Sequence, residues 1–177
     1  ENERGRKMNK EQGLDHLIEV IDGSFDAIPF PDGTFDIVWS EDAILHSDNR
    51  TQVIKEAARV LKPGGDLIFT DPMQTDNCDE AVLKPIYDRI NLSSLGSPAF
   101  YRKTCREAGL KEQEFNEMPE QLTLHYARVL EETEQNEYKL EGKVSREYIE
   151  NMKKGLRNWV KGGKEGNLTW GIFHFKK

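Results

Sequence analysis

Residues 29–73 read PFPDGTFDIVWSEDAILHSDNRTQVIKEAARVLKPGGDLIFTDPM, and this stretch decides the fold of the 177-residue chain. Near its start, residues 35–39 form a short, mostly apolar run that is typical of a parallel-sheet strand covered on both faces. Near its end, residues 66–70 have the same character and predict a second strand. The residues between the two runs have the pattern of an amphipathic helix. The stretch therefore predicts a β-α-β unit.

The predicted helix has a start signal, an apolar stripe and a stop signal. Ser47 or Asp48 can cap its N-terminus, because a short polar side chain accepts a hydrogen bond from the first free backbone N–H groups. Residues 62–65 (KPGG) end the helix with turn chemistry. Apolar residues recur at spacings of three and four, which gives one buried face: Val53, Ile54, Ala57, Ala58 and Leu61.

Polar residues follow both predicted strands where each one ends: Ser40, Glu41, Asp42, His46, Thr70 and Asp71. Parallel strands joined by a right-handed helical crossover end at the same edge of the sheet. Open α/β sheets bind their ligands at that edge. The sequence therefore predicts that these side chains gather around a ligand.

The rest of the chain continues the alternation of strands and helices, which is an α/β signature. Further strands are predicted at residues 17–25, 110–115 and 168–175. Further helices are predicted at residues 79–91, 98–108, 121–137 and 145–161, with Ser97 capping the second of these.

The composition limits the classes of function. The 25 basic and 32 acidic residues give a net charge of −7, which argues against a nucleic-acid-binding surface, since phosphate contacts need clustered Lys and Arg. No apolar run approaches the roughly 20 residues of a membrane span, and no signal-peptide region opens the chain. Cys78 and Cys105 lack ligand-like spacing, so we expect free thiols and no metal site. We therefore expect a cytoplasmic protein.

Several motifs resemble those of the class I S-adenosylmethionine-dependent methyltransferases. The pattern PFPDGTFDIVWS, a helix and then RVLKPGGDLIFTDP resembles the fourth and fifth strands of that superfamily, and GSFDAIPF resembles the segment after its third strand. More narrowly, the chain resembles the glycine, sarcosine and dimethylglycine N-methyltransferases, best their sarcosine/dimethylglycine branch. The motifs that carry this narrower resemblance are WSEDAILHS, TDPM, YDRI, SLGSPAFYR and NMKKGLRNWVKGGKEGNLTWG.

The resemblance implies a Rossmann-like α/β fold with a mostly parallel sheet and an antiparallel C-terminal strand. It also implies a glycine-rich cofactor loop and a ribose-binding acidic residue, both of which should precede Glu1, and the chain contains no GxGxG sequence. We therefore expect residues 1–177 to be the C-terminal portion of a single methyltransferase domain, without the N-terminal strands and with insert-like helices at about 119–161.

The activity implied is in-line transfer of a methyl group from S-adenosylmethionine to the nitrogen of sarcosine or dimethylglycine, toward the osmoprotectant glycine betaine. Met73 stands where glycine-specific relatives tend to carry arginine, which favours the more methylated acceptors. A phosphoethanolamine or other small-amine methyltransferase is an alternative, because DAILH looks similar there. The non-enzyme alternative is an inactive fragment that lacks the cofactor loop, or a subunit completed by another polypeptide. The expected partner is a small amino acid, with homo-oligomer formation left open.

Asp42 and His46 are the candidates for the reaction at the acceptor nitrogen. Asp42 follows the first predicted strand and so should lie on the ligand edge, and in the resembling amine methyltransferases the matching acidic residue contacts the substrate amine. His46 shares a face with Asp42 if the intervening turn is helical, and histidine is suited by its ordinary pKa to accept the amine proton. The alternatives are a capping or turn carboxylate for Asp42 and a backbone-bonded polar side chain for His46.

A zwitterionic substrate also needs a cation at its carboxylate. Arg89, in one of the predicted helices, can pair its planar guanidinium with a carboxylate, and Arg102 with Tyr101 is the competing choice. An ordinary surface salt bridge is the alternative for either arginine. Trp39 and Trp170 can supply aromatic faces for the quaternary ammonium that develops, although such tryptophans are more often core residues.

The cofactor residues follow from the resemblance alone. It implies that Ser24 and Phe25 contact the adenine ring of S-adenosylmethionine and that Ser40 contacts its methionine end. Gly23 either lets the backbone approach a neighbour closely or simply turns the chain.

Overall fold

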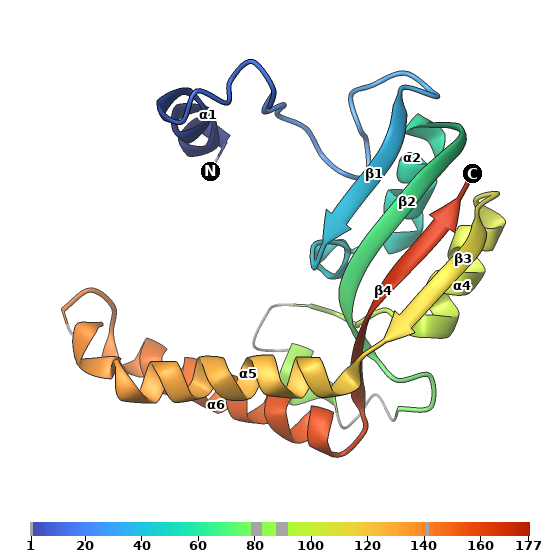
Figure 1. Cartoon of the computed structure of the whole chain (residues 1–177). Coiled ribbons are helices and arrows are strands. Elements are labelled where there is room, and N and C mark those ends of the chain that lie inside the picture. Colours follow the sequence, from blue (N-terminus) through green and yellow to red (C-terminus); the bar gives the residue numbers. More distant parts are fainter. Residues whose placement is uncertain (1, 79–82, 88–91, 141) are drawn as a thin grey trace.

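The computed structural model describes residues 2–78, 83–87, 92–140 and 142–177. At its centre is a four-stranded sheet with the strand order β1-β2-β4-β3 (Figure 1). β1, β2 and β3 run in the same direction, and β4 is antiparallel to both of its neighbours. The predicted sheet, mostly parallel with an antiparallel C-terminal strand, is therefore confirmed. The strands are β1 (Phe35–Glu41), β2 (Leu61–Gln74), β3 (Lys111–Glu117) and β4 (Leu168–Lys176).

The β-α-β unit predicted in residues 29–73 is present. β1 pairs in parallel with β2, so that Glu41 lies opposite Thr70, and helix α2 (Arg50–Val60) connects the two strands. The predicted apolar face of the helix is buried: Val53, Ile54, Ala57 and Ala58 are each at most 6% exposed. The end of β1 therefore lies beside β2 at the edge where a ligand is predicted.

The N-cap of α2 differs from the prediction of Ser47 or Asp48. Asn49 caps the helix, and its Oδ1 accepts a hydrogen bond from the backbone N–H of Gln52 at 3.1 Å. A short 3₁₀ helix, η1 (Ile44–His46), precedes the cap. Because η1 ends at His46, residues 47–49 form the turn that leads into α2, and the last of them caps the helix. Ser47 Oγ supports this turn by accepting a hydrogen bond from the backbone N–H of Asn49 at 3.0 Å.

Replacing Asn49 with Ala removes this cap and should lower the free energy of unfolding by about 1 kcal/mol. Asp48→Ala is the matched control, since Asp48 is exposed and does not cap α2. Urea denaturation of both variants measures the difference. An equal loss in the two variants would contradict the assignment of the cap to Asn49.

β2 begins at Leu61, earlier than predicted. The turn predicted at residues 62–65 is part of this strand, where it interrupts the regular pairing with β1. Gly64 has a φ of +79°, in the left-handed region that favours glycine. Its N–H donates to the carbonyl oxygen of Lys177 at 2.8 Å. The far end of the chain thus completes this turn, which explains why a local pattern places the strand start too late.

One hydrophobic core fills the space between the sheet, α2 and helix α4 (Pro98–Glu107). Phe69 of β2 stacks on Phe173 of β4 with 4.8 Å between ring centroids, and Tyr101 of α4 meets Phe69 edge-on at 5.1 Å. All three rings are 0% exposed. Buried members of this core include Ile54, Leu61, Leu67, Met73, Cys105, Leu110 and Phe175.

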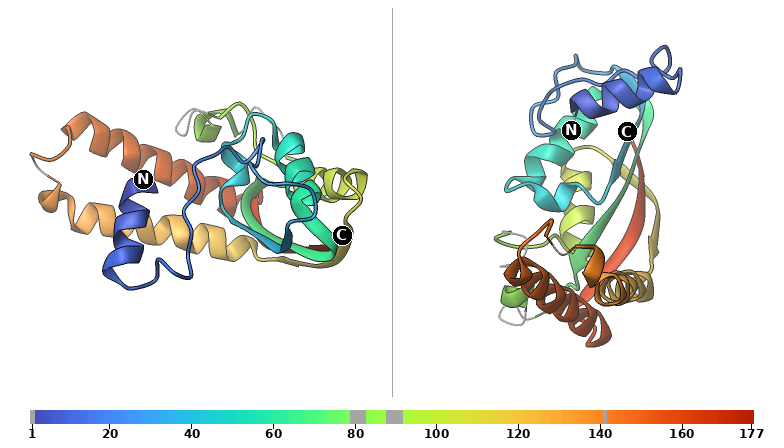
Figure 2. Two further views of the ribbon diagram at one scale, coloured as in Figure 1. Left: turned by 90° about the horizontal axis from the view of Figure 1, so that it is seen from above. Right: turned by 90° about the vertical axis from the view of Figure 1, so that its left-hand side faces the viewer.

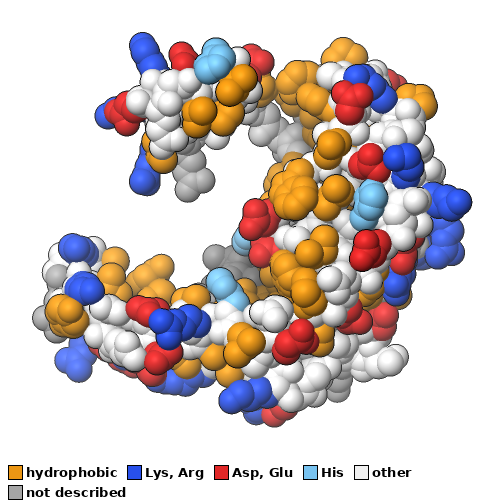
Figure 3. All heavy atoms as spheres, viewed as in Figure 1, with side chains coloured by type: hydrophobic (Ala, Val, Ile, Leu, Met, Phe, Trp, Pro, Cys, Tyr) orange, Lys and Arg blue, Asp and Glu red, His pale blue; other side chains and the backbone are white. Residues whose placement is uncertain are grey.

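The prediction that β1 is covered on both faces is wrong within the described chain. Ile37 and Trp39 are 59% and 61% exposed, whereas Val38, on the opposite face, packs against the core. Both α2 and α4 share the core on the Val38 side, and β1 lies at the edge of the sheet. Figure 3 shows hydrophobic side chains gathered along the inner curve of the molecule.

Residues 17–25, predicted as a strand, are irregular instead, with only an isolated bridge between Ser24 and Ala27. The segment lies beside helix α1 (Asn2–Glu11), where the guanidinium of Arg6 donates to the carbonyl oxygen of Val20 at 3.1 Å. A strand requires a neighbouring strand for its backbone N–H and C=O groups, and in the described chain this segment has none. Its apolar side chains remain exposed: Leu17, Ile18, Ile21 and Phe25.

Helices α5 (Pro119–Gln135) and α6 (Arg146–Lys164) pack against each other and project from one end of the sheet (Figures 1 and 2). A 3₁₀ turn, η2 (Glu137–Lys139), follows α5. Trp159 of α6 is 0% exposed and stacks on Tyr126 of α5 with 4.4 Å between centroids. The interpretation of this pair as an insert within one domain stays a prediction.

The remaining predictions concern caps, thiols and membrane spans. Ser97 caps α4 as predicted, accepting from Phe100 N–H at 3.3 Å. Residues 83–87 are helical, and the rest of the helix predicted at 79–91 lies largely outside the described residues. Neither Cys78 nor Cys105 forms a disulfide within the described residues. No helix in the described part of the chain has the length and apolarity needed to cross a lipid bilayer.

Candidate active site

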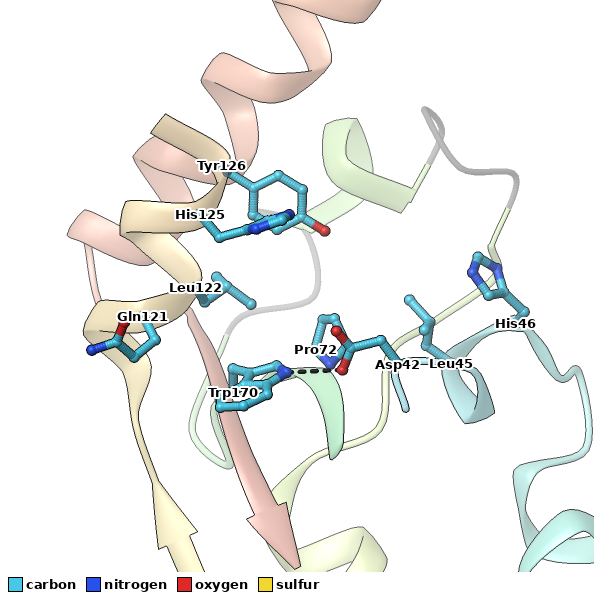
Figure 4. Close-up of a pocket in the computed structure, with 9 residues that line it drawn as sticks. All are labelled: Asp42, Leu45, His46, Pro72, Gln121, Leu122, His125, Tyr126 and Trp170. Carbon is cyan, nitrogen blue, oxygen red and sulfur yellow. Dashed lines mark hydrogen bonds between the residues drawn. The ribbon is translucent and has the colours of Figure 1, made fainter. Parts of the chain in front are cut away.

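A pocket of ≈ 530 Å³ opens between the end of β1, the C-terminal half of β2, the start of β4 and the first turns of α5 (Figure 4). It lies at the sheet edge predicted for a ligand. Its described lining contains one carboxylate and two imidazoles, and neither Lys nor Arg. The lining residues are Asp42, Leu45, His46, Pro72, Gln121, Leu122, His125, Tyr126 and Trp170.

Asp42 is held in the pocket by the two neighbouring strands. Its backbone N–H donates to the carbonyl oxygen of Thr70 at 3.1 Å, and its Oδ1 accepts from Thr70 Oγ1 at 2.7 Å and from the indole Nε1 of Trp170 at 2.8 Å (Figure 4). Its φ of +45° is in the left-handed region, a conformation that costs a non-glycine residue of order 1–3 kcal/mol. The surrounding strands therefore impose this conformation.

The second oxygen of Asp42, Oδ2, accepts no hydrogen bond from the described residues, so its lone pairs remain for a ligand. The alternative role of a helix cap does not apply: the position before η1 is Ala43, which has no side-chain cap, and Asn49 caps α2. Asp42 is therefore a carboxylate that lines the cavity and has one oxygen, Oδ1, held by two hydrogen bonds.

His46 lies in η1, four residues after Asp42, and lines the same pocket. Its ring is exposed and makes no hydrogen bond with a described residue, and Figure 4 places it at the opposite end of the pocket from Trp170. The intervening turn is a short 3₁₀ helix rather than the α-helical turn on which the prediction depended. Asp42 and His46 therefore line one cavity, as predicted, but α-helical spacing is not the reason.

Buried polar groups beneath the pocket fix η1 in place. Asp71 Oδ1 accepts from the backbone N–H of Leu45 at 3.1 Å, and its Oδ2 accepts from the hydroxyl of Tyr101. On the other side, Arg50 Nη2 donates to the carbonyl oxygen of Leu45 at 2.8 Å, and Arg50 Nη1 donates to Ser94 Oγ at 3.0 Å. Both backbone groups of Leu45 are thus satisfied, which orients the turn that carries His46.

Asp71 was predicted among the ligand-edge polar residues, but it is 0% exposed and belongs to this support. Burial raises the pKa of its carboxyl to about 7, although the hydrogen bonds from Tyr101 and Leu45 act in the opposite direction. Because the ordinary pKa of an aspartate carboxyl is 3.8, the folded state binds a proton at Asp71 more tightly than the unfolded state does. The contribution of the group to stability is complete below about pH 4 and is lost as the pH rises to about 7.

Replacing Asp71 with Asn should therefore flatten the pH dependence of the unfolding free energy between pH 4 and pH 7, because the amide keeps the shape of the protonated acid. Denaturant unfolding of both proteins at several pH values in this window measures the effect. The wild-type protein should lose stability relative to the variant as the pH rises. Parallel profiles would contradict an elevated pKa at Asp71.

The structure does not bring Tyr101 and Arg102 to the pocket as carboxylate ligands. Tyr101 is 0% exposed and its hydroxyl is committed to Asp71. Arg102 pairs with Glu112 at 3.0 Å and lies over the ring of Phe115 at 4.8 Å, away from the cavity. Adjacent positions on a helix face different directions, so Tyr101 is buried while Arg102 is on the surface. Arg102 thus forms the ordinary surface salt bridge that was its alternative role.

The other predicted substrate residues have different outcomes. Arg89 lies outside the described residues. Trp39 is on the exposed face of β1 and does not line the pocket. Trp170 does line it, and β4 positions it by pairing antiparallel with β2, which places Trp170 opposite Pro72.

The predicted cofactor residues lie in two places. Ser40 is in β1, two residues before Asp42, and pairs with Phe69 of β2. The segment that contains Gly23, Ser24 and Phe25 is separate from the pocket along the chain and does not line it. A Cβ at Gly23 would lie 3.0 Å from Cδ of Pro29, so this glycine permits close approach of the proline ring. Among the described residues no group of His, Cys, Asp and Glu could hold a metal ion.

Sequence reasoning missed the wall contributed by α5. Gln121 and His125 are four positions apart and so share a face of the helix, and both line the pocket with Tyr126. The available signal was this pair of polar residues in a stretch interpreted by its apolar positions. The sequence predicts the helix, but not the part of the sheet against which its first turns lie.

Comparison with known proteins shows which proteins this chain resembles. The family model described as a methyltransferase domain matches residues 2–69. A sarcosine/dimethylglycine N-methyltransferase of Halorhodospira halochloris is 56% identical over 177 residues, which is 100% of this chain and 63% of that protein. Over its whole length the chain is therefore similar to this N-methyltransferase. A second sarcosine/dimethylglycine N-methyltransferase, from Aphanothece halophytica, is 52% identical over 100% of the chain and 64% of its own length.

Solved structures give the same assignment. A crystal structure from Galdieria sulphuraria, provisionally named a sarcosine dimethylglycine methyltransferase, has a TM-score of 0.93 and 41% identity, covering 99% of this chain and 65% of that one. The predicted class I methyltransferase fold is therefore confirmed. The chain spans less than two thirds of the length of these three relatives.

Proposed function

We propose that this chain forms the acceptor side of an S-adenosylmethionine-dependent N-methyltransferase that methylates sarcosine and/or dimethylglycine toward glycine betaine. The observation that carries the proposal is the Asp42 carboxylate, which Trp170 and Thr70 hold by one oxygen in a cavity of ≈ 530 Å³. A lone carboxylate beside aromatic rings suits a small amine that gains positive charge. The names of the relatives matched along the whole chain support the same substrate class.

The residues of the pocket fit the steps of in-line methyl transfer. The acceptor nitrogen needs a free lone pair, so an ammonium must first lose its proton, and His46 is the group that accepts it. When bound, S-adenosylmethionine supplies the methyl group on an electrophilic sulfonium. The acceptor nitrogen would gain positive charge as it receives the methyl group, and Asp42 would stabilise that charge. Trp170 keeps Asp42 in the orientation that this requires.

The described chain also offers surfaces that fit parts of the methyl donor. Phe25 and Trp39 are 41% and 61% exposed, and aromatic faces of this kind suit an adenine ring. Ser40 lies in β1, two residues before Asp42 in the sequence, and a hydroxyl at this end of the strand suits the methionine end. The hydroxyl of Ser24 donates to the carboxylate of Asp26, and this bond across Phe25 shapes the turn that carries the ring. We propose Phe25 and Ser40 as donor contacts, with Gly23 and Ser24 supporting them.

A methyl-transfer assay on the complete gene product tests this function. The acceptors are sarcosine, dimethylglycine and phosphoethanolamine, with methyl-labelled S-adenosylmethionine as the donor. We expect label in dimethylglycine or betaine and none in methylated phosphoethanolamine, because the described pocket lining has neither Lys nor Arg for a phosphate. Transfer to phosphoethanolamine alone would establish the alternative small-amine activity. Transfer to no amine would contradict the proposed function.

A further inference from the structure

The carboxylate of a zwitterionic substrate has no Lys or Arg to bind among the described residues that line the pocket. Arg102 is paired with Glu112 on the surface. Arg50 is only 8% exposed, and its guanidinium donates to Leu45 and Ser94 beneath the cavity. The donors that the described lining offers to such a carboxylate are therefore side chains other than Lys and Arg.

The α5 wall of the pocket supplies such donors. His125 and Gln121 lie on one face of α5 and line the cavity, whereas Asp42 and His46 line it from the other side (Figure 4). The His125 ring is exposed and touches Tyr126 edge-on at 5.2 Å between centroids. Neither the imidazole of His125 nor the amide of Gln121 makes a hydrogen bond with a described residue, so both keep N–H groups for a ligand.

Two contacts fix this wall relative to Asp42. The backbone N–H of Met118, just before α5, donates to the carbonyl oxygen of Trp170 at 2.8 Å, and the indole of the same Trp170 donates to Asp42. Farther along α5, Tyr126 stacks on the fully buried Trp159. Trp170 thus connects the carboxylate to the start of the helix, and the helix is packed firmly at the turn that carries His125.

We propose that His125, with Gln121 beside it, binds the carboxylate of the amino acid substrate while Asp42 binds its amine; this inference rests on the proposed function. An imidazole has at least one N–H in either protonation state and an amide has two. Together they match the two oxygens of a carboxylate. The pocket then holds the zwitterion between a negative wall at the strand ends and a donor wall on α5, which fixes the direction in which the nitrogen points.

The test compares two acceptors in the complete gene product: dimethylglycine, and dimethylethanolamine, which carries the same dimethylamino group but an uncharged hydroxymethyl group in place of the carboxylate. His125→Leu should raise KM for dimethylglycine roughly 10- to 100-fold, as expected for the loss of a hydrogen bond to a charged group. It should change kcat little and leave KM for dimethylethanolamine unchanged. His125→Gln, which keeps an N–H donor, should restore most of the affinity. If dimethylethanolamine turns over too slowly, its inhibition constant against dimethylglycine provides the same comparison.

Arg128→Leu is the matched control on α5, since Arg128 pairs with Glu131 on the surface outside the pocket. This variant should change neither KM nor kcat for either acceptor. Arg89→Leu tests the competing cation. A loss selective for dimethylglycine in Arg89→Leu but not in His125→Leu would overturn the proposal, as would an equal loss for both acceptors in His125→Leu. Failure of the proposed function gives a different result, because the wild-type protein would then not methylate dimethylglycine.

Discussion

Replacing Asp42 with Ala should lower kcat/KM for sarcosine and dimethylglycine by roughly 10²- to 10³-fold, the usual effect of removing one preorganised electrostatic group from an active site. The reason is that Asp42 is the only carboxylate among the described pocket residues, so no second negative charge there stabilises the developing ammonium. Initial rates with each acceptor measure the loss. Calorimetric titration with S-adenosylhomocysteine should give unchanged donor-site affinity.

Asp42→Asn separates the charge from the structure. The amide oxygen can still accept from Thr70 Oγ1 and from the indole of Trp170, so the fold around the strand end should persist. We expect the same loss of turnover as with Ala but a smaller loss of stability. Asp48→Asn, at an exposed position outside the pocket, is the control carboxylate. Unchanged turnover of dimethylglycine in either Asp42 variant would remove this residue from the site.

Replacing Trp159 with Ala should lower the free energy of unfolding by about 3–5 kcal/mol, the range for removing a large buried aromatic side chain. Trp159 is 0% exposed and stacks on Tyr126, so its removal leaves a cavity directly behind the α5 wall of the pocket. The affinity for the acceptor should fall as well, because the turn that carries His125 loses its packing. Denaturant unfolding and KM for dimethylglycine measure the two effects.

Tyr148→Ala is the matched control on α6, since that ring is 59% exposed, and its effect should stay within about 0.5 kcal/mol. Trp159→Phe, which keeps an aromatic ring against Tyr126, should recover most of the stability. A loss below about 1 kcal/mol in Trp159→Ala would mean that α6 does not support the α5 wall, since cavity formation at a packed site costs more.

Local patterns predicted the β-α-β unit because its signals lie within the unit itself. The apolar runs at 35–39 and 66–70, and the three- and four-residue spacing between them, need no distant partner to be recognised. The N-cap of α2 was less predictable. Ser47, Asp48 and Asn49 are consecutive residues of capping type, and only the end of η1 decides which of them caps the helix.

Features that depend on distant partners were predicted less well. Residues 17–25 have strand-forming side chains, but hydrogen bonding to another strand decides whether a strand forms, and here they lie beside α1. β1 was expected to be covered on both faces because residues 35–39 are mostly apolar. Its position at the sheet edge, with α2 and α4 sharing the core on the other side, leaves Ile37 and Trp39 exposed.

In the candidate site, too, the residues placed by local topology were predicted better than those placed by distant contacts. Asp42 and His46 were predicted from their positions after a strand, and the topology of a parallel sheet places such residues at one edge. Trp170 reaches that edge because β4 pairs antiparallel with β2. His125 was missed because the docking of α5 depends on tertiary contacts. Tyr101 was misplaced because sequence spacing alone did not show that its side of α4 faces the core.

The most direct test of this account is a crystal structure of the complete gene product with S-adenosylhomocysteine and dimethylglycine bound together. We expect the dimethylglycine nitrogen within about 4 Å of Asp42 Oδ2, the reach of an ion pair, and the substrate carboxylate against the α5 wall at His125. Dimethylglycine bound elsewhere, or bound in this pocket with its carboxylate toward Asp42, would contradict the account.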